Sequence, residues 1–257
     1  MRLIYLKAIR VPQLRVALRK IRNYFLASCG RSDAFVDMFK VAKSTQCDLF
    51  VDIGCHHGQT ILRLMETGLN APVLAIDPSA ANLKIAQNLL AKHSAITYCE
   101  AAISDVDGEA CFFVNHNEQT SSLLFNAPGN LASFGADTKL EETVKVQTLT
   151  LDGLVSRLFP SAQRILIKSD TQGAEAQVVR GGITTIRNKC VAFYAEFMLG
   201  QMYENQASFE ELRRLLEDTC GMSLRDIYPC LHDKHGVAVQ ADALWVKPVA
   251  LQCFANR

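Results

Sequence analysis

The chain has 257 residues, 49% of them hydrophobic, which is enough for one large domain with an appendage. No run approaches the roughly 18 to 20 uncharged apolar residues of a membrane span. Basic residues interrupt the N-terminal region in which a cleaved signal peptide would lie. The nine cysteines are an odd number without a C-x-x-C pair, so free thiols in a reducing, cytoplasmic compartment fit better than disulfides or structural zinc.

The net charge of +1 hides an asymmetry along the chain. Residues 1–32 carry eight Lys and Arg and no acid, which leaves 19 basic against 26 acidic residues, a balance of −7, in residues 33–257. A nucleic-acid-binding domain usually spreads Lys and Arg over one face of its folded body. We therefore expect no nucleic-acid partner.

The basic segment is patterned as an amphipathic helix. Its apolar residues recur at spacings of three and four, and they are Val11, Leu14, Leu18, Ile21 and Phe25. We predict a helical extension over residues 1–47 and one domain over residues 48–257. The stripe within residues 1–28 could pack on that domain, pair with a second chain in a homodimer, or lie on the inner face of an anionic membrane.

From residue 48 onward, strands and helices alternate. The predicted strands of the first half are 49–53, 72–77 and 96–102, and the helices between them are 58–67 and 79–92. Alternation of buried strands with helices predicts a parallel sheet that is covered on both faces.

The second half of the chain begins with a less regular pattern of elements. A turn at 105–108 leads into a short strand at 110–114, and residues 115–143 are polar and without a periodic pattern. The elements predicted next are a strand at 144–151, a helix at 152–158, a strand at 165–169, a helix at 174–180, a strand at 191–197 and a helix at 209–219. The last two strands, 223–228 and 243–246, predict an antiparallel hairpin at one edge of the sheet.

The turn after the first strand is the most informative motif. Gly54 and Gly58 bracket a tight turn into a helix, so free backbone N–H groups face whatever occupies the turn. Asp77 ends the second strand, 25 residues after Asp52, where it can accept hydrogen bonds from a ribose diol. This combination predicts a nucleoside-containing ligand.

The spacing of the glycines selects among such ligands. A dinucleotide site needs Gly-x-Gly-x-x-Gly, and His56 occupies the position of the second glycine. A nicotinamide oxidoreductase is therefore the weaker alternative. Asp52 is a poor neighbour for a pyrophosphate but a good one for an ammonium or sulfonium group, which indicates S-adenosylmethionine.

Several blocks, in order along residues 48–200, resemble the FkbM-type S-adenosylmethionine-dependent methyltransferases. The blocks are Val51-Asp52-Ile53-Gly54 with Gly58, Ile76-Asp77-Pro78, Ala101 to Asp105 with Gly108, Ser121-Ser122-Leu123, Thr148 to Asp152, and Ile167 to Glu175. The resemblance implies the class I methyltransferase fold, an α/β Rossmann-like domain with a seven-stranded, mostly parallel sheet and an antiparallel C-terminal hairpin. It also implies O-methylation, in known members often of a sugar or polyketide hydroxyl.

Further cofactor contacts are expected around the same ligand. Glu100 and Ala101, at the end of the third strand, should border the adenine, and Ser169 should lie near the reactive methyl group. His56 and His57 depart from the small residues or Asn usual in the family. Each could contact the methionine carboxylate of the cofactor or cap the following helix.

Asp170 is the first candidate for a general base, because the end of the fourth strand of this fold lies beside the reactive methyl. The alternative is that Asp170 caps the helix that begins near Ala174. Lys168 alternates away from Asp170 along the strand, and a structural ion pair is its expected role.

Two further residues are candidates for the base. Glu196 ends the fifth strand on the side where ligands bind in such sheets. His116 has an intrinsic pKa suited to base catalysis near neutrality. Asp170 and Glu196 lack a third ligand in view, so we expect no metal.

Other features limit the substrate. The chain lacks the Asn/Asp-Pro-Pro-aromatic motif of methyltransferases that act on nucleic-acid amines, so methylation of a nucleobase is disfavoured. A small molecule or a glycan is the expected acceptor, and its specificity should lie in residues 115–143 and 199–208. A non-catalytic module of the same fold is the remaining alternative.

Overall fold

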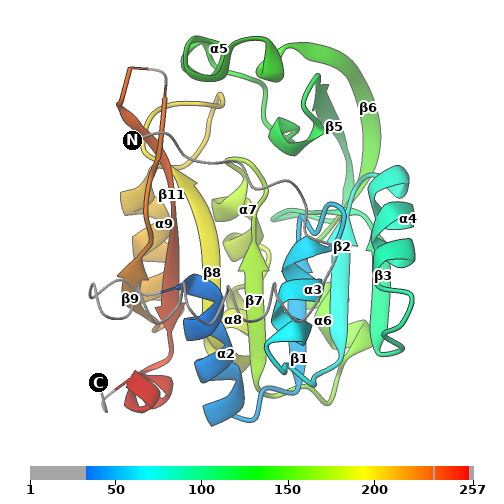
Figure 1. Cartoon of the computed structure of the whole chain (residues 1–257), viewed down its shortest axis with the longest axis vertical. Helices are drawn as coiled ribbons and strands as arrows, with labels where there is room; N and C mark the ends of the chain where they lie inside the picture. Colours follow the sequence, from blue (N-terminus) through cyan, green and yellow to red (C-terminus); the bar gives the residue numbers. More distant parts are fainter. Residues whose placement is uncertain (1–32, 234, 255–257) are drawn as a thin grey trace, which may run out of the picture.

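The structure is a computed structural model that describes residues 33–233 and 235–254 (Figure 1). The amphipathic stripe predicted within residues 1–28 lies outside the described residues, so its role stays a prediction. Within the described ranges, no helix combines the length and the apolar character required to cross a membrane.

The central sheet contains the predicted parallel strands (Figure 1). Its strands are β1 (Leu49–Ile53), β2 (Val73–Asp77), β3 (Ile96–Glu100), β7 (Ile165–Ser169), β8 (Cys190–Met198), β9 (Ser223–Ile227), β10 (Leu231–His232) and β11 (Ala238–Val246). The hydrogen-bonded order is β10-β11-β8-β7-β1-β2-β3, with β9 also paired to β11. The five strands from β3 to β8 are parallel, and β11 is antiparallel to its neighbours.

The eight strands occupy seven positions. Gln240 pairs with Met198 of β8 and with Leu231 of β10, and Ala243 pairs with β8 and with Ile227 of β9. Because β9 and β10 thus lie on the same side of β11, they form one interrupted edge strand. The predicted seven-stranded sheet with an antiparallel C-terminal hairpin is confirmed.

Helices cover both faces, as the alternation of elements predicts. One face carries α2 (Ala34–Ser44), α3 (Gln59–Glu66) and α4 (Ala80–Leu89), and the other carries α6 (Leu151–Leu158), α7 (Glu175–Arg180), α8 (Ile183–Lys189) and α9 (Phe209–Arg214). Within β1, Phe50 packs on the first group while Val51 packs on the second, since successive side chains of a strand point to opposite faces. Helix α2 falls inside the predicted extension, yet Met38 and Val41 are fully buried against the sheet.

A second, smaller sheet stands above the carboxyl ends of the central strands (Figure 1). It consists of β4 (Ala102–Ile103), β6 (Leu140–Leu149) and β5 (Gly108–Asn115), in that order. The predicted strand 96–102 is therefore split between two sheets, and the predicted strand 144–151 begins earlier and ends before α6. Between β5 and β6 lie the short helices η1 (Glu118–Thr120), α5 (Pro128–Phe134) and η2 (Gly135–Thr138), which the sequence did not predict.

The predicted helix 209–219 is regular only in its first part. After α9 the chain continues as a π-helical segment, η3 (Leu215–Thr219), and η4 (Pro248–Phe254) closes the described chain. Residues 102–149 comprise the second sheet and the short helices between its strands, and we call them the lid layer. The lid layer covers the carboxyl ends of β1, β2, β7 and β8.

Candidate functional site

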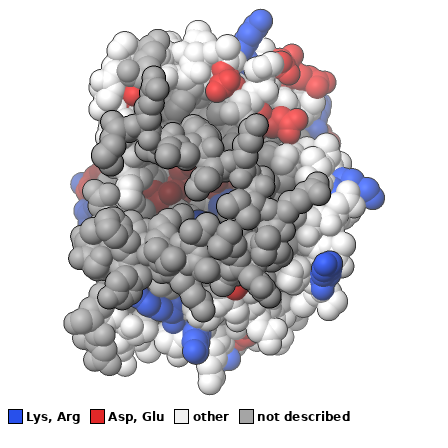
Figure 2. Space-filling model, viewed as in Figure 1, with Lys and Arg blue, Asp and Glu red and all other residues white. Residues whose placement is uncertain are grey.

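A cavity of about 710 Å³ lies between the carboxyl ends of the central strands and the lid layer. Figure 2 shows acidic side chains in a hollow on this face of the molecule. Of the residues predicted to form the site, Gly54, His56, Asp77, Ala101, Asp170 and Glu196 line this cavity. The size is that of a pocket for a small organic ligand or cofactor.

The first turn is shaped by left-handed backbone. Gly54 has φ of 71°, and a Cβ atom there would lie 2.0 Å from the carbonyl oxygen of Asp170, so only glycine lets β1 and β7 approach at this point. His56 has φ of 47°, and its backbone N–H donates to Asp77 Oδ2 at 2.8 Å. The turn and the end of β2 are therefore fixed to each other.

Asp77 organises the second wall of the cavity. Its Oδ1 accepts from the backbone N–H of Ser79 at 3.0 Å and from Asn82 Nδ2 at 3.2 Å, while Oδ2 accepts from His56. Only 5% of the residue is exposed. A carboxylate has about four acceptor positions, so Asp77 retains capacity for a ligand hydroxyl.

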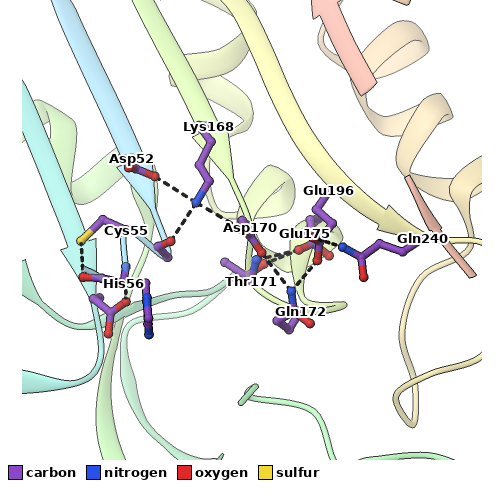
Figure 3. Close-up of polar contacts among 12 residues, drawn as sticks. Asp52, Cys55, His56, Lys168, Asp170, Thr171, Gln172, Glu175, Glu196 and Gln240 are labelled. Carbon is purple, nitrogen blue, oxygen red and sulfur yellow. Dashed lines mark hydrogen bonds and ion pairs between the residues drawn. The ribbon is translucent and has the colours of Figure 1, made fainter. Parts of the chain in front are cut away.

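A buried ion network joins β1 and β7 (Figure 3). Lys168 Nζ lies 3.1 Å from Asp52 Oδ1 and 3.5 Å from Asp170 Oδ2, and it donates to the carbonyl oxygen of Gly54 at 2.8 Å. Burial raises the pKa of Asp52 to about 6, against the opposing charge of Lys168. Burial alone would lower the pKa of Lys168, but the carboxylates of Asp52 and Asp170 outweigh it and raise that pKa. The expected ion pair of Lys168 is present, and Lys168 also lines the cavity.

A second polar cluster surrounds Glu196 at the end of β8 (Figure 3). Gln172 Nε2 donates to Asp170 Oδ1 at 3.0 Å and to Glu196 Oε2, and Gln240 Nε2 donates to Glu196 Oε1. Burial, reinforced by the negative charges of Asp170 and Asp242, raises the pKa of Glu196 well above its ordinary value. Asp170 and Glu196 thus both accept a hydrogen bond from the side-chain amide of Gln172. Their environments differ, since the Asp170 side chain is 36% exposed whereas Glu196 is buried.

The alternative role of Asp170 as a helix cap is wrong. Helix α7 begins at Glu175 with Ala174 as its N-cap residue and without a side-chain cap. Glu175 instead folds back: Oε1 accepts from the N–H of Thr171 at 2.7 Å and Oε2 from the N–H of Gly173 at 3.0 Å. The loop after β7 is therefore held by Glu175, which leaves the Asp170 carboxylate to the cavity.

The structure does not bring the remaining predicted residues to the cavity wall. The side chain of His116 is 63% exposed and pairs with Glu141 at 2.6 Å. Glu100 is exposed at the end of β3, whereas Asp52 and Ser169 are fully buried behind the wall. Gly58 lies at the start of α3, where a Cβ atom would meet Leu90 at 2.9 Å.

The paired histidines form a separate feature. The rings of His56 and His57 stack with centroids 3.6 Å apart, and burial, followed by the neighbouring His57, lowers the pKa of His56. Within residues 33–233 and 235–254, ligand atoms of His56, His57 and Glu118 lie within 4.8 Å of one another. Because stacked rings direct their nitrogens nearly in parallel, the two histidines would have to rotate before they could share an ion. The expectation of a metal-free site remains a prediction.

Residues from distant segments close the site, and Ser122 and Tyr203 fall in the regions 115–143 and 199–208 that the sequence analysis assigned to specificity without individual roles. Tyr203 O–H lies 3.0 Å from Gln172 Oε1 and 2.9 Å from the carbonyl oxygen of Thr120, and Ser122 Oγ donates to the carbonyl oxygen of Gln172 at 2.8 Å. Gln172 lies within the motif that runs from Lys168 to Glu175, so its position could have been noticed. Tyr203 and Gln240 carry no local signal, because only the fold brings them there.

The glycine turn, the carboxylate after β2 and the charged end of β7 define the site of a class I methyltransferase. The chain belongs to the FkbM family, since the methyltransferase FkbM domain matches residues 52–223, more than half of the chain. It is 25% identical over 173 residues to the 2-O-methyltransferase NoeI of Sinorhizobium fredii (strain NBRC 101917 / NGR234), a match that spans 65% of this chain and 70% of that protein.

Solved structures with a similar fold are more distant in sequence. The N-methyltransferase NodS from Bradyrhizobium japonicum aligns with a TM-score of 0.45 and 9% identity over 83% of this chain and 94% of that one. Fibrillarin from Aeropyrum pernix, solved with S-adenosyl-L-methionine bound, aligns with a TM-score of 0.42 and 10% identity over 77% and 66% of the two chains.

S-adenosylmethionine is the cofactor, and the residues present fit it. The cavity offers the left-handed turn at Gly54 and His56, the carboxylate of Asp77 with acceptor capacity to spare, and the apolar Ala101 and Ile103 beside it. The carboxylates of Asp77 and Asp170 lie in the same cavity, where a sulfonium would be favoured over an anion.

Proposed function

We propose that this methyltransferase acts on oxygen, and that its acceptor is a hydroxyl group of a small molecule or a glycan. The single observation that carries the proposal is the Asp170 carboxylate, which enters the cavity at the end of β7 without a capping role. A hydroxyl must lose a proton to become methylated, and a carboxylate within reach can accept it. The similarity to a 2-O-methyltransferase supports the same direction.

In the proposed mechanism the chain supplies alignment and a proton acceptor. When bound, S-adenosylmethionine supplies an electrophilic methyl group. Asp77 would hold the ribose, and the turn from Gly54 to His56 would hold the methionine end. Lys168 and Gln172 contact different oxygens of Asp170, which orients that carboxylate toward the acceptor. Glu196 accepts hydrogen bonds from Gln172 and Gln240, so it would hold Gln172 in place beside Asp170.

The test combines a labelled cofactor with one substitution. The full chain is incubated with methyl-labelled S-adenosylmethionine and fractionated glycan, lipid and metabolite extracts, and the labelled product is identified. With the acceptor in hand, Asp170→Asn should lower kcat by about 10² or more, the range for a general base, while the cofactor Kd rises by no more than about fivefold. Turnover close to that of the unmodified protein would mean that Asp170 is not the general base, and Glu196 or His116 would then be the candidate. Label on a nitrogen atom of the product would overturn O-methylation.

A metal is not part of the proposed mechanism. EDTA should leave the rate unchanged, and a loss of rate that Mg²⁺ restores would contradict this.

We also propose that the basic residues 1–28 bind anionic membranes peripherally, on the strength of their charge and apolar stripe. Co-sedimentation with anionic vesicles should be salt-sensitive and should be lost when residues 1–28 are removed. The absence of pelleting at low salt would leave packing on the domain or on a second chain as the role of this segment.

A further inference from the structure

The ionisable groups around the cavity are mostly acidic. The described lining residues include six with carboxyl side chains, which are Asp77, Glu118, Asp137, Glu142, Asp170 and Glu196. The same set contains one lysine, Lys168, and no arginine. The cavity wall is therefore a region of negative potential.

Lys168 does not offset this potential for a ligand. Its side chain is 6% exposed, and its charge is matched by the buried Asp52 at 3.1 Å before Asp170 is counted. The ammonium group of Lys168 also donates a hydrogen bond to the backbone carbonyl of Gly54. Burial lowers the pKa of His56, which disfavours a positive charge on its ring. Asp170 thus lies 36% exposed toward the cavity with its negative charge only partly compensated.

The two forms of the cofactor differ by one charge. S-adenosylmethionine carries a sulfonium, an ammonium and a carboxylate, for a net charge of +1, whereas its thioether product, S-adenosylhomocysteine, has a net charge of zero. A cavity with low-dielectric walls and a surplus of carboxylates attracts a cation more strongly than water does. The two ligands are otherwise nearly the same in shape, so charge is what can separate them.

We propose that this cavity discriminates by charge: it holds the sulfonium cofactor more tightly than the neutral thioether product, and Asp170 is the main source of the difference. The inference rests on the proposed function only in placing Asp170 beside the reacting methyl. The same charge disfavours acceptors that carry phosphate or carboxylate groups, so the acceptor class is narrowed to uncharged or amine-bearing hydroxyl compounds.

The charge balance of the reaction adds a second expectation. As the sulfur–methyl bond breaks, sulfur keeps the electron pair and becomes neutral, the methyl forms a bond to the acceptor oxygen, and the hydroxyl proton passes to Asp170. The cavity keeps its net charge until that proton reaches solvent. Loss of negative charge from the cavity should therefore weaken binding of the sulfonium and leave binding of the neutral thioether nearly unchanged.

The experiment is a calorimetric titration of the full chain with three probes. They are S-adenosylmethionine, S-adenosylhomocysteine, and sinefungin, an analogue with an amine in place of the sulfonium. At pH 8 and 20 mM NaCl, both cationic ligands should bind about tenfold or more tightly than the thioether, the scale of one partly screened ion pair. The gap should narrow at 300 mM NaCl, where the Debye length falls below 8 Å.

Two substitutions locate the effect. Asp170→Asn should weaken the cationic ligands by about fivefold and leave the thioether within twofold, since the change removes charge and little volume. Glu109→Gln is the matched control, because Glu109 is exposed on β5 and outside the lining, and it should change none of the three.

Equal affinities for the cofactor and its product, or an Asp170→Asn variant that weakens both alike, would overturn the inference. Binding requires no acceptor, so a preference for the cations without any labelled hydroxyl product would leave this inference standing and remove the O-methylation proposal. Hydroxyl methylation together with equal affinities would remove this inference and leave the O-methylation proposal standing.

Discussion

The ends of the central strands and the lid layer above them are held together by different chemistry. Beneath the cavity, charged side chains are buried: Asp52 and Glu175 are at most 4% exposed, and Lys168 is 5% exposed. In the lid layer, hydrogen bonds between neutral amides stabilise the structure instead, because Asn126 exchanges hydrogen bonds with Asn115 and accepts one from Asn130. Buried charges make stability depend on pH and on each partner, whereas neutral hydrogen bonds do neither to the same degree. The floor of the site, which is the set of strand ends that carries Asp52, Lys168 and Glu175, should therefore be rigid and pH-sensitive. The roof, which is the lid layer, should open locally.

The largest expected effect comes from removing the buried cation. Lys168→Met leaves Asp52 buried without its partner, and we expect a loss of about 3 to 5 kcal/mol in the free energy of unfolding. Lys145→Met is the matched control in the lid layer, since Lys145 is exposed on β6, and it should cost under about 0.5 kcal/mol. Urea unfolding at pH 7.5 measures both. Similar losses in the two variants would remove the distinction between floor and roof.

The pH dependence of stability tests the same distinction. Burial raises the pKa of Glu175 to about 7 and that of Asp52 to about 6, above the ordinary values of 4.5 and 3.8. Between about pH 4 and pH 7 the folded state therefore keeps protons that the unfolded state has released, so these groups make the free energy of unfolding fall as pH rises. The share of Glu175 is about 3 kcal/mol across that window.

Glu175→Gln removes this share, and urea unfolding at pH 5, 6, 7 and 8 should show a weaker fall with pH than in the unmodified protein. The variant also loses an acceptor for the N–H of Gly173, so it should be less stable at pH 5. Parallel pH profiles for the two proteins would show that Glu175 is not the buried acid that the structure describes.

Cofactor affinity gives a smaller and more local measure. Asp77→Ala should weaken binding of S-adenosylmethionine by about 1.5 to 3 kcal/mol, the scale of hydrogen bonds to a charged group. Calorimetric titration of the folded variant measures this, with the exposed Asp218→Ala on η3 as the control. Unchanged affinity would remove the ribose assignment of Asp77.

The smallest effect should appear in the roof. Asn126→Ala breaks the amide network, in which Asn126 Nδ2 donates to Asn115 Oδ1 at 2.7 Å and to the carbonyl oxygen of Thr138 at 2.9 Å. Amide hydrogen exchange in residues 115–139 should accelerate by about fivefold, a cost near 1 kcal/mol, with the midpoint of global unfolding unchanged. Asn88→Ala on the exposed side of α4 is the control. A shift of the global midpoint would mean that roof and floor unfold as one unit.

The amino-acid sequence by itself determined the parallel central strands, the two helical layers, the C-terminal hairpin and the turn from Gly54 to His56. These features depend on local information: runs of buried residues, helical spacing, and glycine where the backbone must be left-handed. The carboxylates of Asp77 and Asp170 could be predicted for the same reason, since parallel strands bring their carboxyl ends to one edge.

The tertiary structure alone decided the lid layer, the placement of His116 and the partners of Glu196. Strand β6 pairs with β5 across residues 116–139, and Gln240 reaches Glu196 from another strand, so no local pattern reveals either contact. His116 and Asp170 are both candidate bases in the sequence, with Asp170 the first. Packing separates them: the fold directs His116 to solvent beside Glu141 and holds Asp170 between Lys168 and Gln172, because long-range contacts, and not residue type, set where a side chain points.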